Sequence, residues 1–510
     1  MRILFIYPNL NAQIGFNYGI SFLSAVLKDH GHYTGLLNIN EQLGYPLDFD
    51  RIRSDIKSFA PDLIGISMVS NQYHYCEQIA AFIKEKFPSL PIVGGGIHAT
   101  ADPEGVMASG HFDFLCLGEG EHALLELVSR LETGGDCSTV SNIWARKNGA
   151  LIRNRVSAFV DIASLPQKDY DVFDFQKLID AKGGWVGVMA SRGCPYRCTY
   201  CFNHQMINLY RKDAGPDRKA LRYIRRHPID DVITELAYLI NTYRNITTFI
   251  FDDDIFTLSR AYLQEFCRRY QEEIRLPFVV NGHVKNFDRH KAFALKEAGC
   301  TIVKFGLESG SERVRRDILH RYMSNEDIEK SFAAAHEAGL HTSAFVMFGF
   351  PYETKDDILM TIRLLGRIKP GRFRWSIFFP YANTDAWEIA RKGGFIDEDK
   401  WRSLDNFFEE SCLRFGDEMD LWIDKLQKVF PWYVNRYTEW PIAGQYADLV
   451  KEVESLTLQE WESRKDTVVE ADQKISGHMT AAKEVHYAIK YNSFMGVRSD
   501  YFLAEEQNGR

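Results

Sequence analysis

The sequence lacks any apolar stretch approaching about 18 residues, the length that a membrane-spanning helix requires. It also lacks a basic stripe: 69 acidic and 61 basic residues give a net charge of −8, with both signs mixed along the chain. The acidic excess is explained by solvation, so neither a membrane nor a nucleic acid is expected as a partner. Residues 1–8 are too few for the apolar part of a signal peptide and indicate a first strand.

Cysteine is scarce, with nine residues in 510. Six of them stand singly, without the spacing of a disulfide framework: Cys76, Cys116, Cys137, Cys267, Cys300 and Cys412. Isolated cysteines of this kind behave as small buried hydrophobes. We therefore expect reduced thiols and the reducing cytoplasm as the compartment.

The remaining cysteines, Cys194, Cys198 and Cys201, follow the spacing C-x3-C-x2-C, and no fourth cysteine completes the set. Structural zinc and ordinary ferredoxin clusters both take four protein ligands. Three thiolates on a four-iron cluster would leave one iron open to a ligand that is not protein. A chance cluster of core cysteines is the alternative, but Gly193 and Pro195 favour an exposed loop.

Residues 1–140 alternate short apolar strands with helical patterns. The strands are expected at 2–9, 33–40, 62–68, 91–96 and 112–118. This alternation predicts an α/β domain with a doubly wound parallel sheet. Ligands of such sheets bind outside the carboxyl ends of the strands.

Glycine and polar residues gather at those strand ends. No G-x-G-x-x-G follows the first strand, so a dinucleotide site is not supported. The successive glycines at 94–96 permit close approach of a large flat ligand. The candidate ligand-binding residues are Pro8, Asn9, Ser67, Ser70, Asn71, Gly95, Gly96, His98, Gly118 and Glu119.

Residues 141–184 are expected to form a hairpin, with Asn148-Gly149 at its turn, and an ordered linker. Strand–helix alternation resumes over 185–395. Six strands are expected, at 185–191, 247–252, 278–283, 301–309, 341–349 and 373–381. Six units are too few for a closed eight-unit barrel and predict an open, partial (β/α)6 barrel.

Acidic and glycine-rich segments follow three strands of this barrel. They supply the candidates Asp252, Asp253, Glu308, Ser309 and Gly349. Successive buried acids need a cation or hydrogen-bond donors, although a helix cap in a solvated loop would also explain them. Residues 396–510 are expected to be mainly helical, and their large aromatic residues indicate a core or a cap over the barrel mouth.

The cysteine loop, with Tyr200 before its last cysteine, resembles that of the radical S-adenosylmethionine (SAM) enzymes. The resemblance implies that Cys194, Cys198 and Cys201 ligate a 4Fe–4S cluster whose open iron chelates SAM. The reduced cluster would then cleave SAM to a 5′-deoxyadenosyl radical, with Tyr200 near the adenine.

The resemblance extends to the strand ends of the barrel. Asp252 or Asp253 would accept from the methionyl ammonium group of SAM. Glu308, in the G-x-E-S-G-S segment with Ser309, would orient the ribose or methionine part. Gly349, in a Gly-x-Pro turn, would expose backbone to the adenine.

The first domain resembles the cobalamin-binding domain fused to many radical SAM enzymes, through residues 94–99 and 117–121. It departs from the D-x-H-x-x-G motif by which other cobalamin proteins supply histidine to cobalt. We therefore expect cobalamin without a histidine below the metal. Ser70 and Asn71 would face its lower side, and His98 would either approach the corrin or be satisfied within the protein.

The resemblance implies a cobalamin-dependent radical SAM methyltransferase that acts on an unactivated carbon of a small molecule. It would take electrons from an external reductant of flavodoxin or ferredoxin type. A ring-forming or oxidising enzyme without net methyl transfer is one alternative. Methylthiotransfer is another, but its second cluster would need three more cysteines in the first domain. Cys76, Cys116 and Cys137 are available by count, yet Cys76 is expected in a helix and Cys116 in a strand. An iron–sulfur electron carrier or a cobalamin sensor is the non-enzymatic alternative, but a carrier would lack the acid-rich and G-x-E-S-G-S strand ends. The sequence does not identify the catalytic residues or the substrate.

Overall fold

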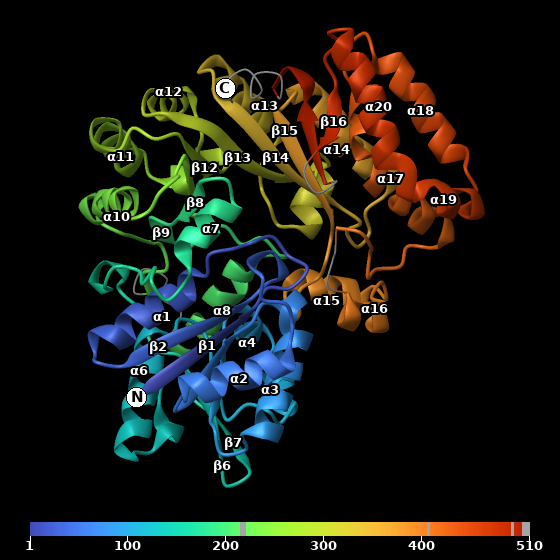
Figure 1. The fold of residues 1–510 in the computed structure, drawn as a ribbon. Helices are drawn as coiled ribbons and strands as arrows, with labels where there is room; N and C mark the ends of the chain where they lie inside the picture. The colour runs from blue at the N-terminus through green and yellow to red at the C-terminus, as the bar shows by residue number, and fades with distance from the viewer. Residues whose placement is uncertain (215–220, 405–407, 491–493, 502–510) are drawn as a thin grey trace. The chain divides into compact units, whose positions relative to one another are not determined.

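The first sheet follows the order β2-β1-β3-β4-β5-β6-β7 in the computed structural model. The structure describes residues 1–214, 221–404, 408–490 and 494–501 (Figure 1). Strands β1 to β5 are parallel to one another, and β6 and β7 extend the sheet beyond β5 as antiparallel strands. The predicted doubly wound sheet is thus confirmed, with the predicted hairpin as an added edge.

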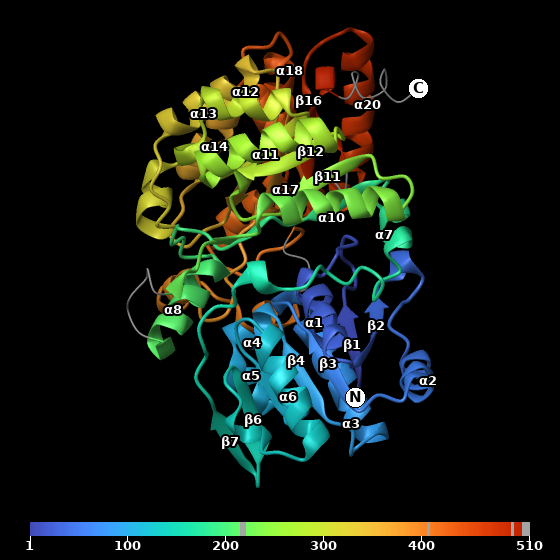
Figure 2. The same ribbon diagram turned by 90° about the vertical axis from the view of Figure 1, so that its left-hand side faces the viewer.

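The elements of this region follow the predicted alternation closely. The strands are β1 (Arg2–Pro8), β2 (Tyr33–Ile39), β3 (Leu63–Ser67), β4 (Ile92–Gly95), β5 (Phe114–Cys116), β6 (Ile143–Lys147) and β7 (Ala150–Arg153). The helices are α1 (Tyr18–Asp29), α2 (Phe49–Phe59), α3 (Tyr73–Lys86), α4 (Ile97–Ala101), α5 (Pro103–Ala108) and α6 (Glu121–Thr133). Helix α1 contacts α6, and α2 contacts α3 (Figure 2). The short helix α4 was not predicted.

The apolar strands bury their side chains on both faces, which explains why they form a parallel sheet. Ile3, Ile6 and Ile64 are fully buried, as are Ile92 and Leu115 in the neighbouring strands. The α1 helix begins where the side chain of Asn17 accepts a hydrogen bond from the amide of Ile20, a typical N-cap.

The chain divides into two compact units. The first contains Met1–Ile250 with Tyr381–Thr384, and the second contains Phe251–Pro380 with Asp385–Arg510. The first unit continues through α7 (Phe175–Ala181), β8 (Trp185–Val188), β9 (Ser191–Arg192), α8 (Phe202–Ala214), β10 (Arg225–Arg226) and α10 (Ile229–Thr242), and it ends within β11 (Thr248–Phe251). The domain boundaries expected at 140, 184 and 395 stay predictions.

The second sheet holds eight of the described strands, in the order β16-β17-β15-β14-β13-β12-β11-β8. Six of them are the predicted barrel strands in chain order, and the pairs from β12 to β15 are parallel. The strands β12 (Phe278–Gly282), β13 (Cys300–Glu308), β14 (His341–Phe348) and β15 (Arg372–Ile377) alternate with α11 (Arg260–Glu273), α12 (Arg289–Glu297), α13 (Asn325–Glu337) and α14 (Lys355–Ile368). The predicted strand–helix series is confirmed.

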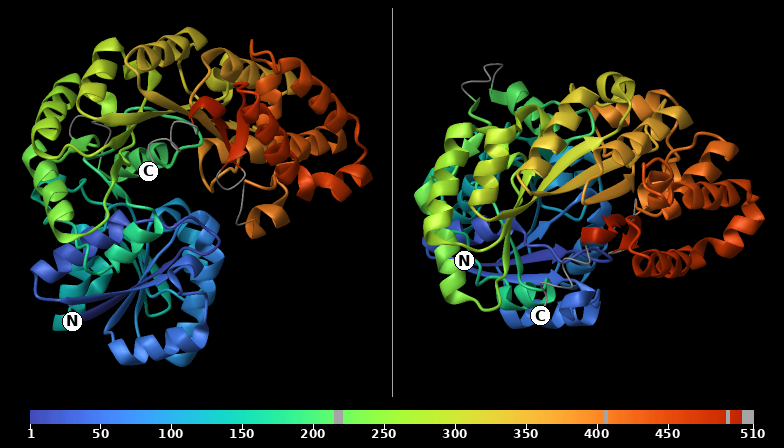
Figure 3. Two further views of the ribbon diagram at one scale, coloured as in Figure 1. Left: turned by 45° about the horizontal axis from the view of Figure 1, so that its top comes forward. Right: turned by 90° about the horizontal axis from the view of Figure 1, so that it is seen from above.

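The C-terminal region is mainly helical, as predicted. Figure 3 shows its helices in orange and red: α15 (Asp385–Lys392), α16 (Glu398–Ser403), α17 (Asp417–Arg436), α18 (Ala443–Ser455), α19 (Leu458–Arg464) and α20 (Val468–Ala481). Trp432 is buried and donates to Asp472, which supports the core interpretation of these aromatic residues. The prediction missed two strands, β16 (Tyr487–Lys490) and β17 (Met495–Arg498), which pair antiparallel at the edge of β15. None of the helices in the described ranges combines the length and hydropathy needed to cross a bilayer.

Candidate functional site

A cavity of about 520 Å³ lies at the carboxyl ends of the parallel strands β1, β3, β4 and β5. Segments that follow β3, β4 and β5 form its wall, as expected for a ligand site in a sheet of this kind. Five candidates from the sequence line it together: Ser67, Gly95, Gly96, Gly118 and Glu119. The lining is mainly apolar, which suits a large organic ligand.

Glycine occupies positions 95 and 96, at the end of β4, for two different physical reasons. A Cβ on Gly96 would lie 2.7 Å from the carbonyl oxygen of Met68, and its φ of 102° disfavours other residues. A Cβ on Gly95 would meet only Cys116, at 3.8 Å, in ordinary contact. The missing side chain of Gly95 therefore leaves room on the cavity side. This cradle fits a flat cofactor such as a corrin.

The other first-domain candidates do not line the cavity. The Nδ2 of Asn9 donates to the carbonyl oxygen of Gln13 at 3.0 Å and thereby shapes the loop after β1. His98 lies in α4, where its Nδ1 is 3.2 Å from the hydroxyl of Ser70. Burial lowers the pKa of His98 to about 4, and its Nε2 has no hydrogen-bond partner among the described residues. Pro8 and Asn71 likewise lie outside the lining.

Sequence reasoning missed the contribution of the segment before α1. Phe16 and Asn17 line the cavity, and so does Tyr18, the first residue of α1. The Nδ2 of Asn17 donates to the hydroxyl of Ser67 at 3.1 Å, so this N-cap residue also fixes a residue of the cavity wall. An asparagine before an apolar helical pattern is a recognisable N-cap signal, but the pattern does not reveal its contact with β3.

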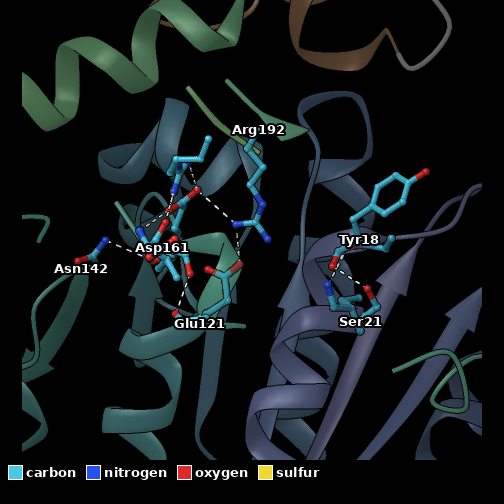
Figure 4. A network of polar contacts seen from close by, with 12 residues as sticks. Tyr18, Ser21, Glu121, Asn142, Asp161 and Arg192 are labelled. Carbon is cyan, nitrogen blue, oxygen red and sulfur yellow. Dashed lines mark hydrogen bonds and ion pairs between the residues drawn. The ribbon is translucent and has the colours of Figure 1, made fainter. Parts of the chain in front are cut away.

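Glu119 is held by two arginines, Arg192 and Arg225. Figure 4 shows Arg192 among the polar contacts of this region. The Oε1 of Glu119 lies 3.2 Å from Arg192 Nη1, and Arg225 donates to both carboxylate oxygens at 2.7 Å. Burial alone would raise the pKa of Glu119, but the hydrogen bonds from Arg225 and the charges of both arginines hold this pKa below its ordinary value. Arg192 also pairs with Glu121 at 2.7 Å.

The three motif cysteines lie on one loop between β9 and α8. Cys198 is 5% exposed, whereas Cys194, Cys201 and Tyr200 are half-buried. The amide of Cys201 donates to the carbonyl oxygen of Cys198 at 3.1 Å, which forms a turn. In the described residues, no three His, Cys, Asp or Glu side chains are gathered at a single point. Three thiols on one short loop nevertheless fit an iron–sulfur cluster by donor type, and they would converge on binding.

The G-x-E-S-G-S segment ends β13 with an unusual backbone. Glu308 has a φ of 65° and is 9% exposed, and the register with β14 shifts between Gly306 and Glu308. Such irregularities re-aim side chains near functional sites. Glu308 Oε1 lies 3.9 Å from Arg321 Nη2.

Arg315 fixes the backbone of Ser309, the next residue of this segment. It is fully buried, and its Nη1 donates to the carbonyl oxygen of Ser309 at 2.5 Å. Burial lowers the pKa of Arg315 to about 10. The hydroxyl of Thr361 accepts from the amide of Gly310 at 2.7 Å, so the segment is fixed from α14 as well.

The turn after β14 is fixed by Glu353. Its Oε2 accepts hydrogen bonds from the amides of Gly349 and Phe350, at 2.7 and 3.1 Å. Burial raises the pKa of Glu353 to about 8. After β11, Asp252 is exposed whereas Asp253 is 1% exposed, and the carbonyl oxygen of Asp253 accepts from Asn281 at 2.9 Å. The candidates of the barrel thus sit at strand ends, as predicted.

Comparison with known protein families identifies two domains in this chain. Residues 188–365 match the family model of the radical SAM superfamily, and residues 12–128 match that of the B12 binding domain. The chain is therefore a radical SAM enzyme with a B12-binding domain. Its two domains place it among the cobalamin-dependent radical SAM enzymes, whose cofactors are a 4Fe–4S cluster, SAM and cobalamin.

Three similar proteins illustrate the range of this group. The uncharacterized methyltransferase PH0819 of Pyrococcus horikoshii is 27% identical over 413 residues, covering 79% of this chain and 86% of that protein. The anaerobic magnesium-protoporphyrin IX monomethyl ester cyclase of Rubrivivax gelatinosus is 22% identical over 447 residues, covering 84% and 77%. The structure of the cobalamin-dependent SAM radical enzyme OxsB, with aqua-cobalamin and SAM bound, matches with a TM-score of 0.66 at 15% identity, covering 94% and 75%. That likeness shows the fold.

Proposed function

We propose that this enzyme is a cobalamin-dependent radical SAM methyltransferase that methylates an unactivated carbon of a small molecule. The observation that carries the proposal is the glycine-walled cavity of the B12-binding domain in a chain that also has a radical SAM domain. The relative PH0819, which bears the name of a methyltransferase, supports methyl transfer over other outcomes. When bound, the cluster supplies an electron for SAM cleavage, and cobalamin carries the methyl group.

The proposal assigns the cofactors to particular residues. Cys194, Cys198 and Cys201 would hold the cluster, and Tyr200 would lie near the adenine. The cavity wall at Ser67, Gly95 and Gly96 would face the corrin, and so would Gly118. Among the described residues that line the cavity there is no histidine, which supports cobalamin binding without an imidazole ligand from this cavity.

The strand ends of the barrel would hold SAM. Asp253, buried after β11, would accept from the ammonium group, with Asp252 as the exposed alternative. Glu308 and Ser309 would orient the ribose or methionine part, because Arg315 fixes the carbonyl group of Ser309 and Thr361 fixes the amide of Gly310 beside it. Gly349 would offer backbone to the adenine, since Glu353 holds its amide.

An enzyme of this class needs an external reductant, and we propose one of flavodoxin or ferredoxin type. The scattered cysteines favour a reducing compartment, the cytoplasm, because Cys76, Cys267 and Cys300 are buried as thiols. Burial raises the pKa of Cys116 to about 12, which disfavours the thiolate that a second cluster would need. This argues against methylthiotransfer.

The test uses anaerobically reconstituted full-length protein with cobalamin, SAM and titanium(III) citrate. Metal analysis should find about four irons per chain, as one 4Fe–4S cluster requires. The methyltransferase should release both S-adenosylhomocysteine and 5′-deoxyadenosine, the first only when cobalamin is present. Protein that holds iron and corrin but releases neither product would refute the proposal.

The second candidate is a ring-forming or oxidising reaction without net methyl transfer. The similarity to the Rubrivivax gelatinosus cyclase favours it. Such an enzyme would release 5′-deoxyadenosine without cobalamin-dependent S-adenosylhomocysteine. Product mass separates the two as well, because methyl transfer adds one CH2.

A further inference from the structure

The turn of residues 118–121, after β5, receives contacts from both sides of the cysteine loop. It lines the cavity with Gly118, Glu119, Gly120 and Glu121. Arg192, two residues before Cys194, reaches it from one side. Tyr210, on the helix that begins directly after Cys201, reaches it from the other. We call residues 118–121 the anchor turn.

On the first side, a short ribbon presents two arginines to the anchor turn. Strands β9 and β10 pair antiparallel, with Arg192 opposite Arg225. Both guanidinium groups contact Glu119. Arg192 also contacts Glu121, as Figure 4 shows. Gly193 follows directly: its φ is 97°, and a Cβ there would lie 2.4 Å from the carbonyl oxygen of Tyr223. The backbone leading into Cys194 is therefore tightly fixed.

On the second side, the hydroxyl of Tyr210 accepts a hydrogen bond from the amide of Glu119 at 2.9 Å. The Nδ2 of Asn142 donates to the same hydroxyl at 3.4 Å and to the carbonyl oxygen of Leu117 at 2.9 Å. Tyr210 is fully buried. A Cβ on Gly118 would lie only 2.5 Å from the hydroxyl oxygen of Tyr210, which is too close for both to be present. The helix α8 therefore docks against the turn with no room for a side chain at residue 118.

The network is closed and shielded from water. Glu119 Oε2 also accepts from the amide of Val160 at 2.8 Å. The side chains of Glu119, Arg192 and Arg225 are 11%, 15% and 8% exposed. Buried ion pairs with this many hydrogen bonds fix geometry, because separating one member strands the others without compensation. Both carboxylate oxygens of Glu119 are occupied within the protein.

We propose that Glu119 and Tyr210 are positioning residues that hold both ends of the cysteine loop on the anchor turn and so set the distance between cluster and cobalamin. This inference rests on the proposed function, since it assigns the loop to the cluster and the cavity to cobalamin. It gives Glu119 a task other than direct contact with the cofactor. The distance matters because the two cofactors must act on one substrate atom in turn.

Two variants and one control test the inference. Glu119→Gln removes the charge that both arginines share, and Tyr210→Phe removes only the hydroxyl. The control is Glu104→Gln, the same substitution at a carboxylate that Arg153 also contacts through two nitrogens, at 2.7 and 2.8 Å. Glu104 is exposed and does not line the cavity.

The first readout is hydrogen exchange of residues 193–214 in protein without cofactors. Both variants should exchange faster in this segment, by about 2- to 12-fold for the loss of one buried hydrogen bond, whereas Glu104→Gln should match the wild type. The second readout is pulsed electron paramagnetic resonance of the loaded protein, in which the reduced cluster speeds the relaxation of cob(II)alamin. The variants should show a weaker or broader interaction at unchanged iron and corrin content.

Exchange and spin interaction equal to the wild type in both variants would overturn the inference. Faster exchange with an unchanged spin interaction would overturn it too, because the residues would then be merely structural. If Glu119→Gln fails to fold, Tyr210→Phe decides. A wild type that binds neither iron nor cobalamin contradicts the proposed function instead, and the exchange data alone then decide whether the anchor turn holds the loop.

Discussion

The carboxylate of Glu353 accepts hydrogen bonds from the amides of Gly349 and Phe350, and it does so while it is buried from solvent. A carboxylate in this position closes the turn after β14 from its own C-terminal side. The same burial raises its pKa to about 8, from an ordinary value of 4.5. The turn that we assign to adenine is therefore held by a group that ionises near neutral pH.

The raised pKa of Glu353 predicts a pH-dependent stability. A group with a raised folded-state pKa contributes stability that is fully present below its unfolded value, about 4.5, and is lost as the pH rises through about 8. Glu353→Gln cannot ionise but keeps an acceptor oxygen, so its urea midpoint should fall less between pH 5 and pH 8.5 than that of the wild type. The control is Glu326→Gln at an exposed helical site, which should keep the wild-type slope. Equal slopes for Glu353→Gln and wild type would contradict the assignment.

Gly95 should control cobalamin affinity without controlling folding. A side chain there would project into the cavity with one ordinary contact, so Gly95→Leu should fold and compete with the corrin. Overpacking costs about 1–3 kcal/mol, which corresponds to a loss of about 5- to 150-fold in affinity. The measurement is titration of the anaerobic protein with cob(II)alamin, followed by its absorption spectrum.

Substitutions at two other glycines serve as comparisons for this experiment. Gly444→Leu places the same side chain where nothing lies within 4 Å and should leave cobalamin affinity unchanged. Gly96→Ala should lower the unfolding free energy by about 1–3 kcal/mol, because of its positive φ and the close carbonyl oxygen of Met68. Tight cobalamin binding by Gly95→Leu would remove this cavity from consideration as the corrin site.

Bound cob(II)alamin should lack nitrogen coupling from a protein imidazole. In the part of the chain that the structure describes, no histidine lines the cavity, and His98 is engaged with Ser70 outside it. The expected electron paramagnetic resonance spectrum therefore shows no protein-derived nitrogen splitting, with or without His98→Asn. A splitting that disappears in His98→Asn would show that α4 rearranges to offer this imidazole to cobalt.

Cys198→Ala should abolish SAM cleavage, because the cluster would lose one of its three protein ligands. Iron and sulfide content should fall well below the wild type, and 5′-deoxyadenosine should no longer form. Cys267→Ala is the matched control: this thiol is also buried, but it lies in α11, so the change should cost only about 1–2 kcal/mol of stability. Full activity in Cys198→Ala would refute the ligand assignment.

The sequence predicted the strand series because buried parallel strands are continuous apolar runs, such as residues 3–6 and 63–66. It also predicted which edge of the sheet holds the site, since that edge follows from strand direction. It could not predict which side chains at that edge face the cavity. Helix α4 begins directly after Gly96 and directs His98 toward Ser70, and no local pattern indicated that helix.

The surroundings of Glu119 were likewise beyond the sequence. Its partners Arg192 and Arg225 are 73 and 106 residues away along the chain. The local sequence Gly-Glu-Gly-Glu does not indicate which distant arginines will pair with it. The carboxylate of Glu119 was therefore expected to contact a cofactor. The strands β16 and β17 escaped prediction for a similar reason: each has four residues, and the pairing of β17 with β15 joins segments more than 100 residues apart.

The antiparallel strand β17 has a consequence for handling the protein. It occupies the edge of β15 along Arg372, Phe373 and Arg374. Shortening the chain before Met495 would strip this cover and leave a row of backbone donors and acceptors open to pairing with another molecule. Self-association after C-terminal trimming would thus arise from the barrel sheet, far along the chain from the cut.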